Sequence, residues 1–395
     1  MEWKEVTLGD FMQCNPKRTI KKGQKARKIT MDLLIPHSKT IRNWNYEPYS
    51  GGAKFQNGDT IMARITPCLE NGKHAFVSIL NKGEIAYGST EYFVFCGKED
   101  VSDNDFVYYL TKTPLFRDTA IKSMVGSSGR QRAQMDVLEN LKMLVPKDIS
   151  DQRRIASILS SLDRKIELNN KINADLEEMA QAIFKNWFVD FEPFKNGKFV
   201  DSELGMIPEG WKVGTLEDIA EITMGQSPAG NSLNENGEGM IFYQGSSDFG
   251  FRFPSIRVFT TEPKRLAVAN SVLFSVRAPV GDINVAKEEC CIGRGVASIK
   301  SKYGHDSYLF YAMKSLHKLF DSFDGEGTVF GSINKKTLSA IQILLPSDGI
   351  VEQFNNVASS FDDRIRSLSD ENSRLSLLRD TLLPRLMSGE LEVPE

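Results

Sequence analysis

Long apolar runs, paired cysteines and clustered histidines are all missing from this 395-residue sequence. No stretch approaches about 18 uncharged apolar residues, so we expect no membrane-spanning helix. The charged start Met1–Lys4 predicts no secretory signal. An odd number of cysteines without paired spacing argues against a disulfide framework; the five are Cys14, Cys68, Cys96, Cys290 and Cys291. We therefore expect a cytoplasmic protein in a reducing setting, with no membrane contact.

Motifs that carry catalysis are also missing. No Gly-x-x-x-x-Gly-Lys-Ser/Thr loop occurs, which excludes a standard ATPase site, and no Asp/Asn-Pro-Pro-aromatic motif of amino-methyltransferases is present. The four histidines lie far apart, without metal-ligand spacing. Asp163-Arg164-Lys165 is reminiscent of nuclease carboxylate–lysine sites, but no Pro-Asp precedes it, and we interpret it as a solvated helix face. We expect no catalytic residue, no metal and no cofactor.

The charge of the chain is unevenly distributed. Hydrophobic residues make up 41% and charged residues 26%, as in globular proteins, and the net charge is −3. Residues 1–150 hold 22 Lys and Arg against 17 Asp and Glu, whereas residues 201–346 hold 14 against 17. From Gln13 to Ile29 seven basic residues occur with no acidic one: Lys17, Arg18, Lys21, Lys22, Lys25, Arg27 and Lys28. This run is either a solvated loop or a strip that contacts nucleic-acid phosphates.

Two parts of the chain repeat the same features in the same order. Trp3–Asp10 and Trp211–Asp218 are identical at five of eight positions, at an offset of 208 residues. Later pairs of segments match at offsets of 200 and 199 residues. These pairs are Val137–Pro146 with Thr337–Pro346, and Ser160–Ile166 with Ser359–Ile365. The chain is therefore a tandem duplication in which a module is followed by a helix, twice.

Each module reads as a mixed α/β fold. Module 1 spans residues 1–150, and module 2 with its junction spans residues 191–346. Short apolar, β-branched runs bounded by Gly, Asn, Asp, Ser and Pro are typical of strands and turns; they include Thr60–Ile65, Tyr92–Phe95, Ser271–Val276 and Ala340–Leu345. A helical pattern follows late in each module, at Asp105–Leu110 and Ser307–Leu319. We predict an α+β protein with a twisted, mostly antiparallel sheet in each module.

Residues 151–190 and 347–395 carry the spacing of a coiled-coil seam. The seam of the first helix is Ile155, Leu159, Leu162, Ile166, Asn169, Asn173, Leu176, Ala180, Ile183 and Trp187. The seam of the second is Phe354, Ala358, Phe361, Ile365, Leu368, Asn372, Leu375, Leu382 and Leu386. Its asparagines either lie buried, where they fix the register, or face water at the edge. Because neither apolar stripe is stable in water, we expect the helices to pair and to relate the modules by a pseudo-two-fold axis.

Gly-rich loops in each module carry side chains that reach DNA bases and phosphates. Arg64 and Arg277 each precede a proline at the end of an apolar strand, so we expect them at equivalent places. The loops Gly126–Arg132 and Gly327–Lys336 both stand just ahead of the next repeat block. Any one side chain alone reads as a surface residue, but the recurrence favours the loops as sites. The candidate DNA-binding residues are Lys17, Arg18, Lys21, Lys22, Lys25, Arg27, Arg64, Arg130, Arg132, Gln226, Gln244, Ser246, Arg252, Arg277, Lys335 and Lys336.

Three segments carry a family resemblance: Ile155–Phe188 with the continuation to Phe191, the junction Leu204–Trp211, and the tail Leu382–Leu391. With the duplication, they make the whole chain resemble the specificity (S) subunit of a type I restriction–modification system. The joint pattern is specific, although each segment alone is weak.

The resemblance implies two target recognition domains, each reading one half of a split, asymmetric site in double-stranded DNA. It implies that the two helices form an antiparallel coiled coil that sets the gap and helps to dock two modification subunits, which bind S-adenosylmethionine and methylate adenine. Restriction subunits with an ATP-driven motor and nuclease complete such complexes. Because these recognition domains vary greatly, no base contact transfers to a numbered residue.

Two other functions stay open at this point. One is a self-contained nuclease or methyltransferase with an unrecognised site. The other is a coiled-coil scaffold that binds the modification subunit without reading DNA. Exchange of module 1 separates the scaffold from the reader, because only a reader changes half of the recognised sequence.

Overall fold

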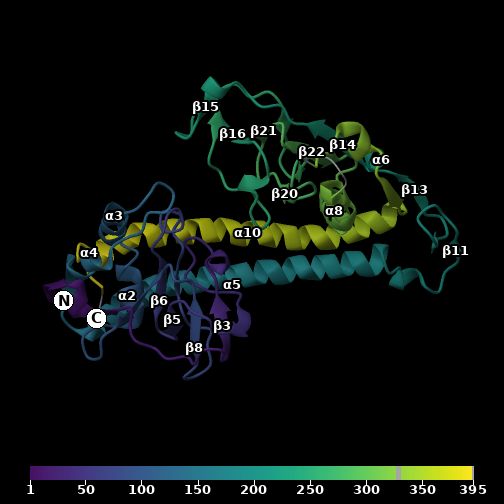
Figure 1. Ribbon diagram of the computed structural model, residues 1–395. Coiled ribbons are helices and arrows are strands. Elements are labelled where there is room, and N and C mark those ends of the chain that lie inside the picture. Colours follow the sequence, from purple (N-terminus) through teal and green to yellow (C-terminus); the bar gives the residue numbers. More distant parts are fainter. Residues whose placement is uncertain (326–330, 394–395) are drawn as a thin grey trace. The chain divides into compact units, whose positions relative to one another are not determined.

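The computed structural model describes residues 1–325 and 331–393, which form two compact units (Figure 1). Unit 1 comprises Met1–Lys171 with Leu368–Glu395, and unit 2 comprises Ile172–Ser367. Each unit combines one α/β module with one half of each long helix. The two units are described separately below.

Module 1 contains two four-stranded sheets and a two-stranded ribbon. Its elements are β1 (Trp3–Thr7), α1 (Leu8–Phe11), β2 (Met12–Cys14), β3 (Lys25–Ile29), β4 (Asn45–Pro48), β5 (Lys54–Gln56), β6 (Thr60–Ala63), β7 (His74–Phe76), β8 (Ile85–Gly88), β9 (Tyr92–Gly97), α2 (Asn104–Leu110), α3 (Pro114–Lys122), α4 (Met135–Glu139) and β10 (Lys142–Pro146). The sheets have the orders β2-β9-β6-β7 and β4-β3-β8-β5, and β1 pairs with β10. The pairings are antiparallel except for β3 with β8.

Module 2 repeats the ribbon and one four-stranded sheet of this plan, and its other sheet has five strands. Its elements, after the junction strands β11 (Phe199–Val200) and β12 (Ile207–Pro208), are β13 (Lys212–Thr215), α6 (Leu216–Ile219), β14 (Ala220–Met224), β15 (Leu233–Asn234), β16 (Met240–Tyr243), β17 (Phe259–Thr260), β18 (Leu266–Ala267), β19 (Val272–Ser275), β20 (Ile283–Val285), β21 (Cys290–Ile292), β22 (Val296–Ser301), α7 (Asp306–Ser315), α8 (His317–Gly325), α9 (Lys335–Ser339) and β23 (Gln342–Leu345). The sheets have the orders β14-β22-β19-β20 and β15-β17-β16-β21-β18, and β13 pairs with β23. The parallel pair is now β16 with β21.

Equivalent caps start equivalent helices in the two modules. Thr7 at the start of α1 accepts a hydrogen bond from the backbone N–H of Asp10 at 3.3 Å. Thr215 holds the same position at α6, where the side chain of Asp218 accepts a hydrogen bond from the backbone N–H of Thr215 at 2.7 Å. Such caps satisfy N–H groups that have no partner inside the helix. The repeated Thr and Asp of the sequence are therefore structural.

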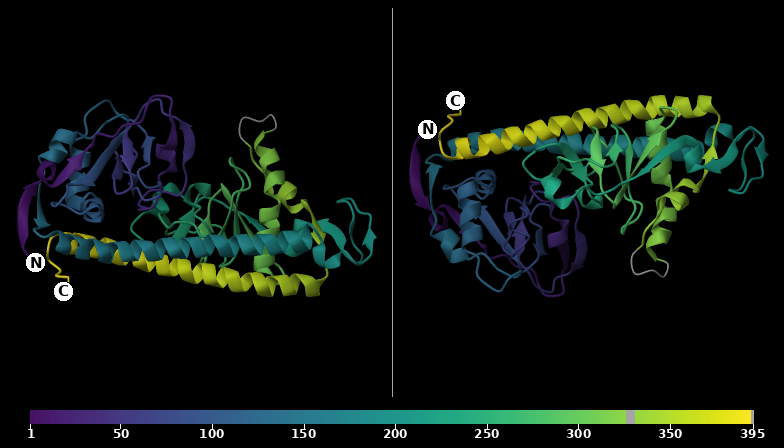
Figure 2. Two further views of the ribbon diagram at one scale, coloured as in Figure 1. Left: turned by 90° about the horizontal axis from the view of Figure 1, so that it is seen from below. Right: turned by 90° about the horizontal axis from the view of Figure 1, so that it is seen from above.

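The two long helices are α5 (Ile149–Phe188) and α10 (Asp348–Met387), each of 40 residues. In unit 1, the first half of α5 packs on the last half of α10, where Asp163 meets Arg379 and Asn169 meets Asn372. In unit 2, the Phe184 and Phe354 rings have centroids 5.4 Å apart. Residue numbers rise along one helix as they fall along the other, so the pairing is antiparallel; both views of Figure 2 show the helices side by side.

Asn169 is buried in the seam of unit 1, and its partner Asn372 is half-buried there. Asn169 is 0% exposed, and its amide group donates to Asn372 at 2.9 Å and to Glu371 at 2.9 Å. Asn372 in turn donates to Asn170 at 2.9 Å. These hydrogen bonds connect specific residues of α5 to specific residues of α10. A shift of register breaks them and leaves buried amides unpaired, which is costly.

The expected fold class is confirmed, with differences at the level of single elements. The helical pattern at Asp105–Leu110 is α2, while Ser307–Leu319 divides into α7 and the start of α8. Ala340 is the C-cap residue of α9 and not part of β23. The short apolar stretch Ala340–Leu345 therefore contains a helix C-cap followed by a strand. The hydrophobicity of these residues alone does not show where the cap ends and the strand begins.

Candidate nucleic-acid interface

The basic run of module 1 splits into paired and unpaired side chains. Arg18 donates to the buried carboxylate of Asp59 through Nε at 2.9 Å, and Arg27 contacts Glu84 at 3.2 Å and lies over the Trp44 ring. Burial raises the pKa of Asp59, and Arg18 opposes this shift. Lys28 contacts Glu47 at 2.8 Å. The exposed side chains of the run are Lys17, Lys21, Lys22 and Lys25.

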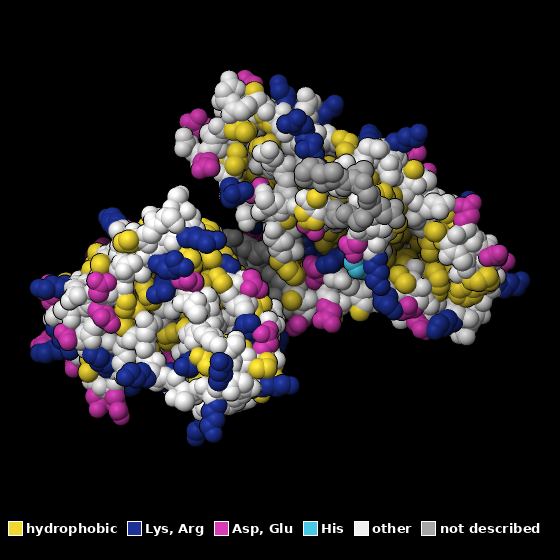
Figure 3. Space-filling view, viewed as in Figure 1, with side chains coloured by type: hydrophobic (Ala, Val, Ile, Leu, Met, Phe, Trp, Pro, Cys, Tyr) yellow, Lys and Arg dark blue, Asp and Glu magenta, His cyan; other side chains and the backbone are white. Residues whose placement is uncertain are grey.

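These four lysines lie on the segment that leads from β2 into the first residue of β3. No hydrogen bond or ion pair ties their ammonium groups to another described residue. They are therefore free to contact a polyanion. Figure 3 shows basic and acidic side chains interspersed on the face in view, not gathered into fields of one sign. Contact with phosphates then depends on such local groups rather than on the net charge.

Backbone hydrogen bonds connect Arg64, which follows β6, to Glu91, which precedes β9, and to Ala133, which follows the Gly126–Arg132 loop. We call this group of connected residues the strand-end corner. Arg64 N–H donates to the Glu91 carbonyl at 3.0 Å, and Ala133 N–H donates to the Arg64 carbonyl at 2.8 Å. The side chain of Glu91 contacts Arg64 at 3.1 Å and Arg132 at 2.8 Å. The Arg132 hydrogen bond is the main cause that lowers the pKa of Glu91.

Module 2 builds the same corner from different residues. Val276 N–H donates to the Gly295 carbonyl at 3.0 Å, and Ile333 N–H donates to the Val276 carbonyl at 3.1 Å. Arg277 forms a bridge with Ser332, as Ile65 does with Arg132 in module 1. Val276, and not Arg277, is therefore the counterpart of Arg64.

The expected equivalence of Arg64 and Arg277 is thus off by one residue. Successive side chains of an extended segment point to opposite faces. The two arginines consequently leave their frames in different directions. Glu91 holds Arg64 in module 1, whereas Arg277 is exposed.

The other candidates of the two modules differ in exposure. Arg130 is exposed in the Gly126–Arg132 loop, and Gln226 and Gln244 are exposed at the ends of β14 and β16. Ser246 is half-buried. Lys335 and Lys336 are exposed in the first turn of α9. The earlier part of the Gly327–Lys336 loop, up to residue 330, lies outside the described residues.

Arg252 does not belong to an exposed surface. It is 3% exposed, and its guanidinium contacts Glu177 of α5 at 2.9 Å and Asp362 of α10 at 2.5 Å. Tyr311 adds a hydrogen bond at 2.9 Å. Burial lowers the pKa of Arg252, but Asp362, Tyr311 and Glu177 more than offset this and keep the group charged.

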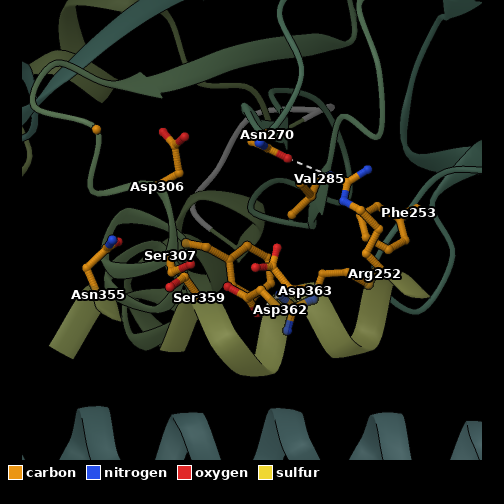
Figure 4. A pocket seen from close by; sticks show the side chains of 13 residues that line it. Arg252, Phe253, Asn270, Val285, Asp306, Ser307, Asn355, Ser359, Asp362 and Asp363 are labelled. Atoms are coloured by element: carbon orange, nitrogen blue, oxygen red, sulfur yellow. Dashed lines mark hydrogen bonds and ion pairs between the residues drawn. The ribbon is translucent and has the colours of Figure 1, made fainter. Parts of the chain in front are cut away.

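Arg252 therefore joins module 2 to both helices within unit 2. Because its donors are used inside the protein, Arg252 is not placed to make the expected contact with DNA. Figure 4 shows Arg252 beside Asp362 at a polar cavity of about 160 Å³ above α10. Sequence reasoning missed this role because Glu177 and Asp362 are 75 and 110 residues away along the chain.

Asp163 forms the corresponding centre in unit 1. It is 5% exposed and accepts hydrogen bonds from Tyr109 at 2.6 Å and from Arg379 at 2.7 Å. The interpretation of Asp163-Arg164-Lys165 as a solvated face is thus wrong for Asp163. A buried carboxylate needs such partners, and they come from α2 and α10.

Among residues 1–325 and 331–393, no three or more His, Cys, Asp or Glu side chains lie together in a way that could hold a metal ion. Burial raises the pKa of Cys14 to about 12 and that of Cys96 to about 11, so both are thiols at neutral pH. No helix in the described part of the chain is long and apolar enough to cross a bilayer.

Comparison with known proteins finds similarity to type I specificity subunits in both halves of the chain. The family model described as type I restriction modification DNA specificity domain matches residues 1–178 and 208–375. The MjaX type I restriction enzyme specificity subunit of Methanocaldococcus jannaschii is 35% identical over 259 residues, which are 65% of this chain and 60% of that protein. The HindI specificity subunit of Haemophilus influenzae is 25% identical over 473 aligned residues, 99% of this chain and 100% of that protein.

A solved structure shares the fold. The type I restriction–modification system S subunit from M. genitalium superposes with a TM-score of 0.54 at 16% identity, over 98% of this chain and 96% of that chain. The family model matches most of the sequence in two segments that each contain one module and most of one long helix. The chain therefore belongs to the family of type I restriction modification DNA specificity domains.

Proposed function

We propose that the two modules of this specificity subunit each bind one half of a bipartite site in double-stranded DNA, within a type I restriction–modification complex. The repeated strand-end corner carries this proposal. Its backbone hydrogen bonds are the same in both modules, while its side chains differ. A duplicated frame with different functional groups suits two half-sites of different sequence.

The exposed lysines of module 1 are proposed to contact phosphates. Lys17, Lys21, Lys22 and Lys25 carry charges that no described carboxylate neutralises. In module 2 the corresponding roles fall to Lys335 and Lys336 at the start of α9. Arg130 is proposed as a base or phosphate contact, because it stands exposed at the tip of a loop. Phosphate contacts position a protein on DNA without carrying sequence information.

The long helices are proposed to space the half-sites and to dock two modification subunits. We assign residues 1–150 and 191–346 to recognition, and residues 151–190 and 347–395 to the helical spacer. A 40-residue helix is about 60 Å long at 1.5 Å per residue. This exceeds the roughly 34–36 Å of one DNA turn. The hydrogen bond between buried Asn169 and half-buried Asn372 supports a spacer of defined register.

The chain is proposed to have no catalytic activity of its own and to work in the cytoplasm. Methylation and cleavage then belong to its partner subunits, including restriction subunits where the complex has them. All five cysteines are free thiols, which fits a reducing setting. Incubation of the purified chain with DNA, S-adenosylmethionine, ATP and Mg²⁺ tests this directly. We expect no turnover, and methylation or cleavage by the chain alone contradicts the proposal.

Exchange of module 1 tests the reading function. Residues 1–150 are replaced by the corresponding segment of another family member, and the full chain is expressed with its modification subunits. We expect one half of the methylated motif to change and the other half to persist. An unchanged motif with normal methylation favours a scaffold that does not read DNA.

A further inference from the structure

Four exposed polar residues stand on neighbouring strand ends at the strand-end corner of module 2. Gln226 follows β14, Gln244 follows β16, Arg277 stands in the segment after β19, and Arg294 stands in the turn between β21 and β22. All four are exposed. The sequence analysis did not single out Arg294, because a lone arginine between two glycines carries no pattern that separates it from an ordinary turn residue.

Backbone hydrogen bonds hold the four positions together. Gln226 N–H donates to the Ile292 carbonyl at 2.9 Å, and Gly295 N–H donates to the Gln244 carbonyl at 3.2 Å. Gly295 in turn accepts from Val276, next to Arg277, at 3.0 Å. The Arg294 N–H donates to the Ser227 hydroxyl at 3.3 Å. The side chains therefore project from one tightly connected piece of backbone.

Glycines make this close approach possible. A Cβ at Gly225 would lie 2.1 Å from the Gly293 carbonyl oxygen, and a Cβ at Gly295 would lie 2.6 Å from the Gln244 carbonyl oxygen. Any other residue forces the strand ends apart. A corner held this firmly loses little conformational freedom when it binds, which favours affinity and selectivity.

Within the described part of the chain, the charges of this corner are not neutralised. No carboxylate among the described residues pairs with Arg277 or Arg294, and no described residue accepts a hydrogen bond from either side chain. Module 1 differs, because Glu91 holds both Arg64 and Arg132 at its corner. In module 2, Gly295 occupies the backbone position that Glu91 holds in module 1. Arg294 likewise occupies the position of Thr90. Module 2 is acidic overall. Its composition therefore does not predict two arginines in neighbouring turns that pair with no described carboxylate.

We infer that this corner is the base-reading site of module 2, and that Arg294 and Arg277 recognise guanine while Gln226 and Gln244 recognise adenine. The inference rests on the proposed function. Arginine donates two parallel hydrogen bonds to guanine O6 and N7, and glutamine exchanges two with adenine N6 and N7 in the major groove. The half-site of module 2 therefore contains at least one G·C pair and at least one A·T pair. Module 1, with its arginines held by Glu91, reads a different sequence.

The test uses the complete complex with its modification subunits, in the variants Arg294→Ala and Arg294→Lys. Binding is measured by competition against duplexes in which each base pair of the wild-type motif is changed in turn. We expect Arg294→Ala to weaken binding of the cognate duplex about ten- to a hundred-fold. It should also abolish discrimination at one G·C pair of the module 2 half, with the module 1 half unchanged. Arg294→Lys keeps the charge but not the planar fork, so it should lose most of that discrimination while keeping phosphate attraction.

Matched variants separate base reading from other effects. Lys212→Ala removes an exposed positive charge from β13 of the same unit and should leave every base preference unchanged. Thr90→Ala, at the counterpart of Arg294 in module 1, should affect the other half of the motif or neither. Because Arg294 makes no side-chain bond to a described residue, its variants should unfold at the wild-type temperature.

Three results are distinguishable. Loss of discrimination at one G·C pair of one half-site supports the inference. Equal discrimination at every position in wild type and Arg294→Ala overturns it, whether or not overall affinity falls, because a phosphate contact produces that pattern. A wild-type complex without any bipartite preference instead contradicts the proposed function itself.

Discussion

The carboxylate of Asp163 lies 2.7 Å from the guanidinium of Arg379, and both side chains are buried in unit 1. Asp362, 199 positions after Asp163, has Arg252 as its partner in unit 2. A tyrosine donates to each carboxylate, Tyr109 to Asp163 and Tyr311 to Asp362. The duplication thus preserved the carboxylate and the tyrosine but took the arginine from a helix in one unit and from a module loop in the other.

Replacement of Arg379 by methionine should destabilise unit 1 strongly. The change leaves the Asp163 carboxylate buried with no cationic partner, which costs about 3–5 kcal/mol in comparable cases. The free energy of unfolding of unit 1 is measured from urea transitions followed by hydrogen exchange of its amides. The double variant Asp163→Asn, Arg379→Met should recover much of the loss, since no buried charge is left. Lys165→Met, which removes a partly exposed 3.5 Å pair with Glu371, should cost less than about 1 kcal/mol.

Replacement of Arg252 by methionine should separate stability from DNA specificity. Glu177 and Asp362 lose their shared partner, so unit 2 should lose several kcal/mol of stability at neutral pH. The base preferences of the complex that still folds should be those of wild type, because Arg252 is 3% exposed. Binding to duplexes with single base-pair changes is the measurement. An altered preference at one base pair, with unit 2 folded, shows instead that Arg252 reaches DNA.

The Asn169–Asn372 hydrogen bond should set register at a cost in stability. Asn169→Leu alone leaves Asn372 without that partner and should lower the stability of unit 1 by about 1–3 kcal/mol. The double variant with Asn372→Leu should return to wild-type stability or above, since an apolar seam packs without unpaired amides. The double variant should also self-associate more readily, as judged by sedimentation velocity of the purified chain. A double variant as unstable as the single one contradicts this account.

Lys112 should make unit 1 more stable as the pH rises above 8. Burial, with Arg379 as the next cause, lowers the pKa of Lys112 to about 8, and its Nζ has no hydrogen-bond partner among the described residues. Between pH 8 and 10.5 the unfolded chain holds this proton and the folded unit does not, so the free energy of unfolding rises by about 1.4 kcal/mol per pH unit. Below pH 8 both states are protonated and the full penalty applies.

Lys112→Met should therefore stabilise unit 1 at pH 7, and its advantage over wild type should shrink between pH 8 and 10. Thermal unfolding across this pH range provides the measurement. Lys122→Met, at an exposed lysine of α3, is the control and should show a constant small difference. A constant advantage of Lys112→Met at every pH would mean that Lys112 titrates normally in the folded unit.

Patterns that are local in sequence predicted much of the fold. The repeated tryptophan segments and the seam spacing are enough to indicate two modules and two long helices, because period and order survive without knowledge of tertiary contacts. The burial of Asn169 was one of two open alternatives, and the structure decided it. The offset between Arg64 and Arg277 was missed, since one residue more or less before a strand end reverses the side-chain direction.

Contacts between distant segments were beyond sequence reasoning. Arg252 looked like a loop arginine, and Asp163 looked like a solvated helix residue. Each is buried by partners from other elements, and Arg379 is 216 residues away from Asp163. Arg294 shows the opposite case, because only the folded backbone places it near Gln244 and Arg277 and so makes it a candidate for base reading.

The most direct test of the central claim is the adenine methylome of cells that carry this chain with its modification subunits. We predict one bipartite methylated motif that disappears when the chain is deleted. Exchange of residues 1–150 should then change one half of that motif and leave the other half intact. A motif that survives deletion of the chain, or one that stays whole after the exchange, contradicts the account of two modules that each read half of the site.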